Sequence, residues 1–549
     1  MSLLFFNGIV HTLDNDNSIY DAIVTDGEKI VAVGDGEALV REWQAAEKVD
    51  LEGAHVYPGF VDAHAHVYGM GERLTKVRLE GMMSKREVLE KLRGIATGLS
   101  TPQPPPPTEV GERGEDGGLG RWIISRGWDH TSWSDNADST FPSKADLDEH
   151  VSTTQPVALT RVDGHALWCN SRALDLAGIT RDTPAPLGGA ILHDENGEPT
   201  GILLDEAMKL VESKIPQPTI DDLVVTLRVG LRYFMKRGHV AVHEMGVSAE
   251  LWEAYVKLYE REGDSLPRAY VFLDMTKETG KKFFVDNYST PQPPPPTGGG
   301  GVGKGGGRLT MTGIKLYLDG ALGSRGAQMF EDYSDDPGNN GLALMEDEEV
   351  VELMQMAAKY KLQIAVHAIG DKANARALDL FERAGVVGGG ATLRIEHAQI
   401  VRDDDVSRFA ELGVYALVQP AFFASDRRWA ADRLGASRMR SAYRWKSFVD
   451  AGVKFVASSD APIEEPDPIA GIALLMNRDG VDDGEAIALG EAVRSYAQTA
   501  CELTKEEAES GRLAVGMRAD MTILDGALPV ATVREVVIGG RIESAPVVR

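Results

Sequence analysis

Eight short apolar runs, most of which end in a polar residue, constrain the fold of this chain more than any other feature. Helical patterns lie between several of them, such as "DDLVVTLRVGLRYFMKRG" before the second run and "DKANARALDLFERAG" after the fifth. Eight strands that alternate with helices predict an α/β fold, a (β/α)8 TIM barrel, whose active site is built at the C-terminal ends of its strands. The runs are 57–66, 238–244, 268–274, 313–320, 362–371, 392–398, 414–420 and 454–462.

The two ends of the chain differ from this middle part and resemble each other. Residues 3–57 contain short runs of alternating apolar and polar residues, broken by Asp-Gly and Asn-Gly. A similar pattern of short apolar runs is found after about residue 511. We therefore expect 1–56 and 511–549 to form one β-sandwich domain, and 57–69 with 216–510 to form the barrel. About 170 residues separate the first two strands, far more than a usual barrel loop, so 70–215 predicts an inserted subdomain over the barrel mouth.

Two low-complexity segments interrupt the pattern. The sequence "STPQPPPPT" occurs at 100–108 and again at 289–297, and each copy runs into a polar or glycine-rich stretch. Proline blocks favour an extended chain and glycine runs stay flexible, so neither adds to a packed core. We expect 100–119 and 289–307 to be surface loops, with a ligand for a proline-binding domain as the alternative.

Charge and cysteine content exclude several classes of partner. The chain has 57 Lys+Arg against 84 Asp+Glu, a net charge of −27, which repels nucleic acid and anionic membranes. Cys169 and Cys501 are too few for a disulfide framework, and we find neither a basic leader nor a membrane-spanning apolar run. We expect a cytoplasmic protein with no nucleic-acid or membrane partner and a possible homo-oligomeric state.

Candidate metal ligands lie at the strand ends. His64 and His66 flank Ala65 at the end of the first strand, where alternate residues point the same way, so both can reach one ion. His367, His397 and Asp460 end the fifth, sixth and eighth strands. Imidazoles with a carboxylate favour a divalent ion such as zinc.

Each of these positions also has an ordinary structural explanation. A single strand histidine is more often a core residue with its own hydrogen bonds, and Asp460 before Ala-Pro suits a turn. His243 lies near a strand end too, and we assign it to packing or to support of the ligands.

Lys315, within "TGIKLYLDGALG", is an unusual residue for a barrel strand. A buried lysine is rare unless something uses it. The alternatives are the polar side of an ordinary strand, or an unmodified amine that pairs with Asp319 or an acidic substrate.

Seven motifs spread over nearly the whole chain carry a resemblance to a known family: "YPGFVDAHAH", "RVDGHALWCNSRALDLAGI", "GIKLYLDGALGSRGA", "AVHAIGDKA", "RIEHAQ", "SSDAPI" and "GRLAVGMRADMTILD". With these motifs in this order the sequence resembles the amidohydrolase superfamily, and within it the amidohydrolase family 3 branch that includes the YtcJ-like proteins and the N-substituted formamide deformylases. In that superfamily a first-strand histidine pair, a fourth-strand lysine, histidines on strands five and six and an eighth-strand aspartate form the metal centre.

This resemblance implies a reaction and a role for each ligand. Lys315 would react with carbon dioxide to give a carbamate that bridges two metals, one held by His64 and His66 and the other by His367 and His397. Asp460 would be a ligand and the general base and acid. The implied function is hydrolysis of a C–N bond of a small-molecule amide, of non-peptide, N-formyl or N-acyl type, through a metal-bound hydroxide.

Substrate recognition is the least defined part of the prediction. The resemblance and the location beside the barrel mouth indicate His165, Trp128 and Arg325 as pocket residues, although Trp128 is more often core and Arg325 can pair with local carboxylates. Gly326 stands where many relatives have threonine. Two other functions remain open: a single-metal deaminase of a cyclic amidine, which normally lacks a fourth-strand lysine, and a non-catalytic regulatory metalloprotein.

Overall fold

The computed structural model describes residues 2–97, 122–136, 138–288, 302–304, 307–481 and 483–543. The predicted loop 100–119 and most of 289–307 lie outside these residues. The chain divides into two units, Met1–Met70 with Gly230–Arg549 and Gly71–Val229, and each is described by itself.

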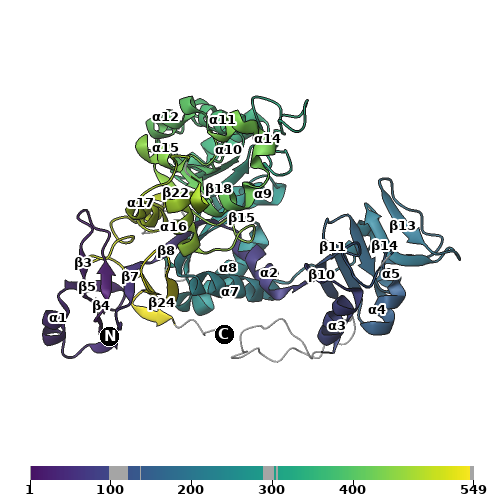
Figure 1. The fold of residues 1–549 in the computed structure, drawn as a ribbon, viewed down its shortest axis with the longest axis horizontal. Helices are drawn as coiled ribbons and strands as arrows, with labels where there is room; N and C mark the ends of the chain where they lie inside the picture. The colour runs from purple at the N-terminus through teal and green to yellow at the C-terminus, as the bar shows by residue number, and fades with distance from the viewer. Residues whose placement is uncertain are drawn as a thin grey trace. The chain divides into compact units, whose positions relative to one another are not determined.

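A parallel eight-stranded sheet forms the centre of the first unit (Figure 1). Its strands follow one another in chain order from β8 to β22, so every strand predicted from the sequence is present and the barrel fold is confirmed. Strand β8 is buried along its whole length, as expected for a strand covered on both faces. The strands are β8 (Phe60–Ala65), β15 (His239–Val247), β16 (Arg268–Asp274), β18 (Leu309–Tyr317), β19 (Gln363–Ala368), β20 (Leu393–His397), β21 (Tyr415–Val418) and β22 (Phe455–Ala457).

The barrel closes just beyond the end of β22 rather than along it. The backbone N–H of Asp460 donates to the carbonyl of His64 at 2.8 Å, and that of His66 donates to the carbonyl of Ala461 at 2.7 Å. The carboxylate of Asp62 accepts a hydrogen bond from the Ser459 hydroxyl at 2.5 Å. The closure therefore fixes the first-strand histidines against the residues that follow the eighth strand.

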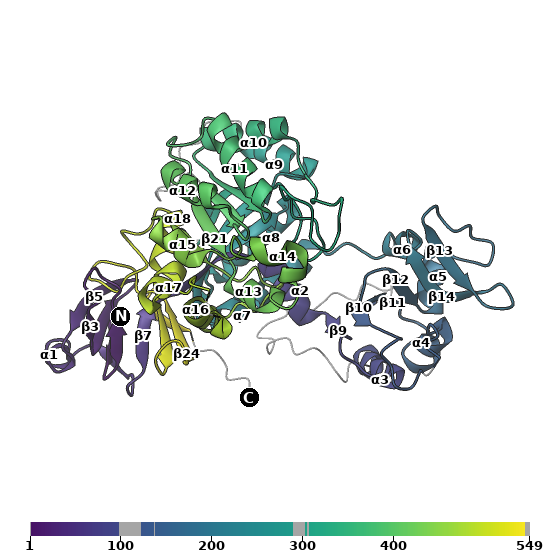
Figure 2. The ribbon, with the colours of Figure 1, turned by 45° about the horizontal axis from the view of Figure 1, so that its top comes forward.

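Helices cover the outside of the barrel, as the ribbons show for α10 and α11 (Figures 1 and 2). Their ends follow ordinary capping rules: Ser248 caps α8, three acidic residues open α10, and Gly413 ends α12 in the left-handed region. These helices are α7 (Ile220–Lys236), α8 (Ala249–Glu262), α9 (Glu278–Tyr288), α10 (Asp347–Lys359), α11 (Asp371–Arg383), α12 (Asp403–Leu412), α13 (Pro420–Asp426), α15 (Trp445–Asp450), α16 (Pro468–Asn477), α17 (Leu489–Tyr496) and α18 (Gln498–Leu503).

One short strand lies within a segment that we expected to be a loop. Strand β17 (Val302–Lys304) pairs antiparallel with the first half of β18. This part of 289–307 is therefore an edge strand, and the expectation of a loop was wrong there.

The two ends of the chain meet in a second β-structure. A six-stranded sheet contains, in order, β25 (Arg541–Glu543), β24 (Thr532–Ile538), β23 (Met521–Asp525), β7 (His55–Pro58), β2 (Ile9–His11) and β3 (Ile19–Tyr20). In it β7 pairs antiparallel with β23. A four-stranded sheet comes from the N-terminal segment alone and contains, in order, β5 (Lys29–Gly34), β4 (Ala22–Asp26), β1 (Ser2–Phe6) and β6 (Glu47–Asp50). One hydrophobic cluster joins both sheets, with Phe5 and Ile23 from one and Val56, Ile523 and Val537 from the other.

The second unit has its own sheet and core. Its strands are, in order, β13 (Gly189–His193), β14 (Pro199–Asp205), β12 (Ala166–Cys169), β11 (Val157–Arg161), β10 (Ile123–Trp128) and β9 (Val77–Arg78). The helices α3 (Lys85–Ala96), α4 (Lys144–His150) and α5 (Ser171–Ala177) lie beside them. The core contains three tryptophans, Trp128, Trp133 and Trp168. Among the described helices of both units, none combines the length and apolar composition needed to cross a bilayer.

Candidate metal centre

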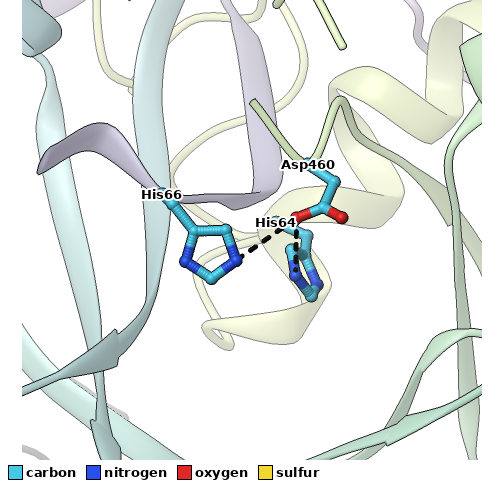
Figure 3. Close-up of side chains that lie close together, drawn as sticks. All are labelled: His64, His66 and Asp460. Atoms are coloured by element: carbon cyan, nitrogen blue, oxygen red, sulfur yellow. Dashed lines mark ion pairs between the residues drawn. The ribbon is translucent and has the colours of Figure 1, made fainter. Parts of the chain in front are cut away.

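Three side chains converge at the point where the barrel closes (Figure 3). His64 is the second-last residue of β8, His66 directly follows that strand, and Asp460 lies three residues after the end of β22. Asp460 Oδ1 is 3.3 Å from the Nε2 atoms of both histidines, although it makes no well-directed hydrogen bond within the described residues. The three ligand atoms all lie within 4.8 Å of one another.

This spacing fits a divalent ion. Ligands bound at about 2.0–2.1 Å in a tetrahedron lie about 3.3 Å from one another. A buried carboxylate oxygen without a hydrogen bond is costly unless another partner, such as an ion, takes that place. Two imidazole nitrogens and a carboxylate oxygen are also the ligand types that zinc prefers.

Two further histidines continue the cluster on strands β19 and β20. The ring centroid of His397 lies 4.9 Å from that of His64 and 4.6 Å from that of His367. His397 Nδ1 lies 2.8 Å from Gln419 Oε1, and His367 Nε2 lies 3.4 Å from Asp319 Oδ1. The hydrogen bond to Gln419 occupies Nδ1 of His397, so its Nε2 is the nitrogen that could bind an ion, whereas His367 Nε2 makes no hydrogen bond within the described residues.

Lys315 lies inside the barrel. Its side chain is 1% exposed, and its Nζ, 5.1 Å from the ring centroid of Tyr317, has no hydrogen-bond partner among the described residues. The proposed partner Asp319 instead accepts three backbone N–H groups at 2.8–3.0 Å. Lys315 is thus neither the solvated side of a strand nor an Asp319 partner.

The protonation states of His367, His397 and Asp460 suit metal binding, whereas at His66 burial would lower the pKa but the adjacent Asp460 holds it above its usual value. Burial, followed by the charge of neighbouring His397, holds the pKa of His367 well below its usual value, and burial lowers the pKa of His397 to about 3. Burial alone would raise the pKa of Asp460, but the adjacent imidazoles hold it well below the usual range. Burial also lowers the pKa of Lys315 to about 8. Neutral imidazoles and an ionised carboxylate are the forms that bind cations.

The backbone is strained at two of these positions. His397 has φ 76° and Asp460 has φ 58°, both in the left-handed region that non-glycine residues rarely adopt. Such outliers concentrate at functional sites, where the surrounding structure enforces them.

Sequence reasoning missed the residues that support the ligands. Glu396 precedes His397 in the motif "RIEHAQ", but its side chain points to His64, and Arg394 pairs with it. Burial would raise the pKa of Glu396, yet Arg394 and His64 hold it well below its usual range. The alternation of strand residues was the available signal, because positions 394 and 396 face the interior of the barrel together. His243 is completely buried and contacts Arg394, which agrees with the packing or support role assigned to it.

The three predicted substrate residues lie in very different places. Trp128 is 0% exposed in the core of the second unit and donates a hydrogen bond to the Leu159 carbonyl at 2.7 Å. As placed it has no surface for a substrate, so we withdraw it as a pocket residue. Arg325 is held by Asp335 through two hydrogen bonds of 3.1 and 2.9 Å, the alternative foreseen for it. His165 has a side chain that is 75% exposed, beside Asp205, and its role stays a prediction.

Comparison with known proteins places this geometry in a family. A family model described as "Amidohydrolase family" matches residues 47–542. The putative amidohydrolase YtcJ of Bacillus subtilis is 29% identical over 540 residues, 96% of this chain and 94% of its own. The N-substituted formamide deformylase of Arthrobacter pascens is 27% identical over 550 residues, 95% of this chain and 93% of its own.

A solved structure agrees with these sequence relatives. The crystal structure of a metal-dependent hydrolase from Pyrococcus furiosus superposes with a TM-score of 0.76 at 30% identity, and the match covers 96% of this chain and 100% of that one. With the family model matching most of the sequence, the chain belongs to the amidohydrolase family.

Proposed function

We propose that this protein is a metal-dependent hydrolase that cleaves the C–N bond of a small, non-peptide amide of N-formyl or N-acyl type. The observation that carries the proposal is the convergence of two imidazole nitrogens and one carboxylate oxygen at 3.3 Å inside the C-terminal end of the barrel. The name of the deformylase relative supports the choice of bond.

The ligand set divides into two groups. His64, His66 and Asp460 would hold one divalent ion, zinc by their ligand chemistry, and His367 and His397 would hold a second. A divalent ion at such a site polarises a substrate carbonyl and makes water more acidic.

Lys315 would join the two groups after modification. Its amine adds to carbon dioxide, forming a C–N bond and releasing one proton, and the resulting carbamate is an anion with two oxygen ligands. The lowered pKa of Lys315, about 8, supplies the neutral amine that this step needs. Complete burial of the side chain within the barrel also keeps competing partners away from Nζ.

Asp460 moves the proton in this proposal. Its Oδ1 faces the two first-strand imidazoles, so Oδ2 is the oxygen left to accept a proton from the attacking water. The low pKa of Asp460 keeps it ionised at neutral pH, the form that can accept a proton. The same oxygen then delivers the proton to the departing nitrogen.

The test is hydrolysis of a panel of N-formyl, N-acyl, cyclic amide, cyclic amidine and ester substrates by zinc-loaded protein, with zinc content measured on the same sample. We expect about two zinc ions per chain and turnover of an amide, lost on chelation and in Asp460→Asn. One zinc per chain with ammonia released from a cyclic amidine would point to the deaminase instead. Wild-type turnover by Asp460→Asn would refute the mechanism.

A further inference from the structure

A completely buried chain of charged groups leads from the interior of the barrel to the metal-facing histidine His64. The His64 Nδ1 group donates to Glu396 Oε2, and Glu396 in turn receives Arg394 Nε at 2.5 Å and Arg394 Nη2 at 3.0 Å. Glu396 and Arg394 are both 0% exposed and His64 is 1% exposed. None of these contacts lies in solvent, so each holds its partner in one orientation.

The hydrogen bond to Glu396 determines which nitrogen of His64 can bind an ion. An ionised carboxylate only accepts hydrogen bonds, so the proton of a neutral His64 ring must lie on Nδ1. The lone pair is then on Nε2, the atom that lies 3.3 Å from Asp460 Oδ1. Metal-binding histidines commonly use such a carboxylate to fix their tautomer and ring direction.

Arg394 fixes Glu396 in the same way. Its planar guanidinium forms a two-pronged contact with both carboxylate oxygens, and Nη2 also donates to the Ala63 carbonyl at 2.6 Å, one residue before His64. The third nitrogen, Nη1, donates to His243 Nδ1 at 3.0 Å. The guanidinium also stacks on Phe272, with Cζ 4.8 Å from the ring centroid.

Stability alone does not account for a buried ion pair such as this one. Apolar residues of similar volume often replace such a pair without loss of stability, because burying two charges costs desolvation. A pair that contacts both the ring and the backbone of a metal-facing histidine has a more specific use.

Resting on the proposed function, we infer that Glu396 and Arg394 are positioning residues for the metal centre: Glu396 holds His64 as the Nδ1–H tautomer with Nε2 toward the ion, and Arg394 holds Glu396. Neither residue touches the substrate. Their contribution is therefore to metal affinity and coordination geometry first, and to turnover only through these.

The experiment measures zinc affinity by competition with a chromophoric chelator, using the full chain stripped of metal. In Arg394→Met/Glu396→Leu, which removes both charges and the acceptor, we expect zinc to bind about 10- to 100-fold more weakly. In Arg394→Met/Glu396→Gln an amide oxygen can still accept from His64 Nδ1, so we expect much of the affinity to return. The absorption spectrum of the cobalt-substituted protein should change in the first variant and recover in the second.

A matched control is available at the other end of the barrel. Arg268 and Asp520 form a second buried arginine–carboxylate pair, which contacts none of the four histidines. Arg268→Met/Asp520→Leu should bind zinc within about twofold of wild type, a change close to the error of such measurements. An equal loss in this control would show general loosening of the barrel and would overturn the inference.

The outcomes separate this inference from the proposed function. Zinc binding unchanged in folded Arg394→Met/Glu396→Leu would overturn the positioning role and leave the function intact. If the wild-type protein binds no zinc, both the positioning role and the proposed function are refuted. Should the double variant fail to fold, Arg394→Lys keeps the charge without the two-pronged contact, and we expect about 10-fold weaker zinc binding; wild-type affinity there would count against the inference.

Discussion

The barrel buries charged groups at both ends of its strands, and two of these clusters, one around Arg268 and one around Lys315, differ in whether their charged groups have partners. At the N-terminal end, Arg268 begins β16 and pairs with Asp520, whose other oxygen accepts the Gly539 N–H at 2.7 Å. Tyr270 donates to Glu506 at 2.5 Å. At the C-terminal end, the buried atoms Lys315 Nζ, His367 Nε2 and Asp460 Oδ1 make no hydrogen bond within the described residues.

This difference distinguishes a stabilising cluster from a functional one. A buried polar atom without a hydrogen bond costs about 1–3 kcal/mol, whereas a paired one stabilises slightly or not at all. The C-terminal cluster therefore lowers the stability of the metal-free protein, and bound cations would compensate for that. We expect substitutions at the N-terminal end to change stability and those at the C-terminal end to change activity.

The largest effect is expected for Asp460→Asn. The amide cannot accept the proton that the carboxylate takes, so kcat/KM on the best substrate should fall by about 10²–10⁴-fold. The free energy of unfolding of the metal-free variant should fall only modestly, because the substitution loses the attraction between the ionised carboxylate and the adjacent imidazoles but keeps the shape of the side chain. A large loss of stability with little loss of activity would reverse the comparison between the two ends.

Arg268→Met tests the opposite end. The substitution leaves the buried Asp520 carboxylate without its cation, so we expect a loss of about 3–5 kcal/mol in the free energy of unfolding, measured in urea. The folded fraction should keep wild-type kcat/KM. An activity loss without a stability loss would show that this cluster is also part of the catalytic machinery.

Lys315→Met tests the cost of the unpartnered amine through pH. In the folded protein the pKa of Lys315 is lowered by burial to about 8 from 10.5, so between these values only the unfolded chain binds the proton. The stability contributed by Lys315 is therefore lowest below pH 8 and rises between pH 8 and 10.5, by roughly 3 kcal/mol.

In the metal-free state, the Lys315→Met variant should lack the increase in stability between pH 8 and 10.5, and at pH 7 it should be more stable than wild type. Urea unfolding of both proteins across this pH range checks it. Parallel stability curves would mean that Lys315 is not desolvated as the structure has it.

The smallest effect is expected for Arg325→Ala. Arg325 pairs with Asp335, which also pairs with Arg433, in a partly exposed position. We expect a loss of less than about 1 kcal/mol in stability and no change in KM. A KM raised more than about tenfold would restore Arg325 as a substrate contact, because this corresponds to about 1.4 kcal/mol of binding.

The fold was predictable because its signals are local. Each barrel strand is a continuous apolar run flanked by a helical pattern. Such a run is typical of a parallel strand that is buried on both faces, so it can be recognised from the sequence alone. The strand-end positions of His64, His66, His367, His397 and Asp460 follow directly from that reading. The division of the chain at residues 70/71 and 229/230 lies close to the boundaries expected for the insertion, which stay a prediction.

The supporting contacts were not predictable in the same way. Glu396 and His64 are 332 positions apart in the sequence, and only the closed barrel brings them together. Trp128 is the opposite case. The motif around it suggested a pocket residue, but it packs with Trp133 and Trp168 in a hydrophobic core. Long-range contacts between polar side chains depend on strand order and register, which hydrophobic periodicity alone does not determine.

The most direct test of the central claim is a crystal structure of the zinc-loaded protein with anomalous diffraction data collected at the zinc absorption edge. We predict one anomalous peak within ligand distance of His64 Nε2, His66 Nε2 and Asp460 Oδ1, and a second beside His367 and His397, with density for a carbamate on Lys315 between them. Zinc bound elsewhere in the chain, with these side chains unchanged and empty, would contradict the account.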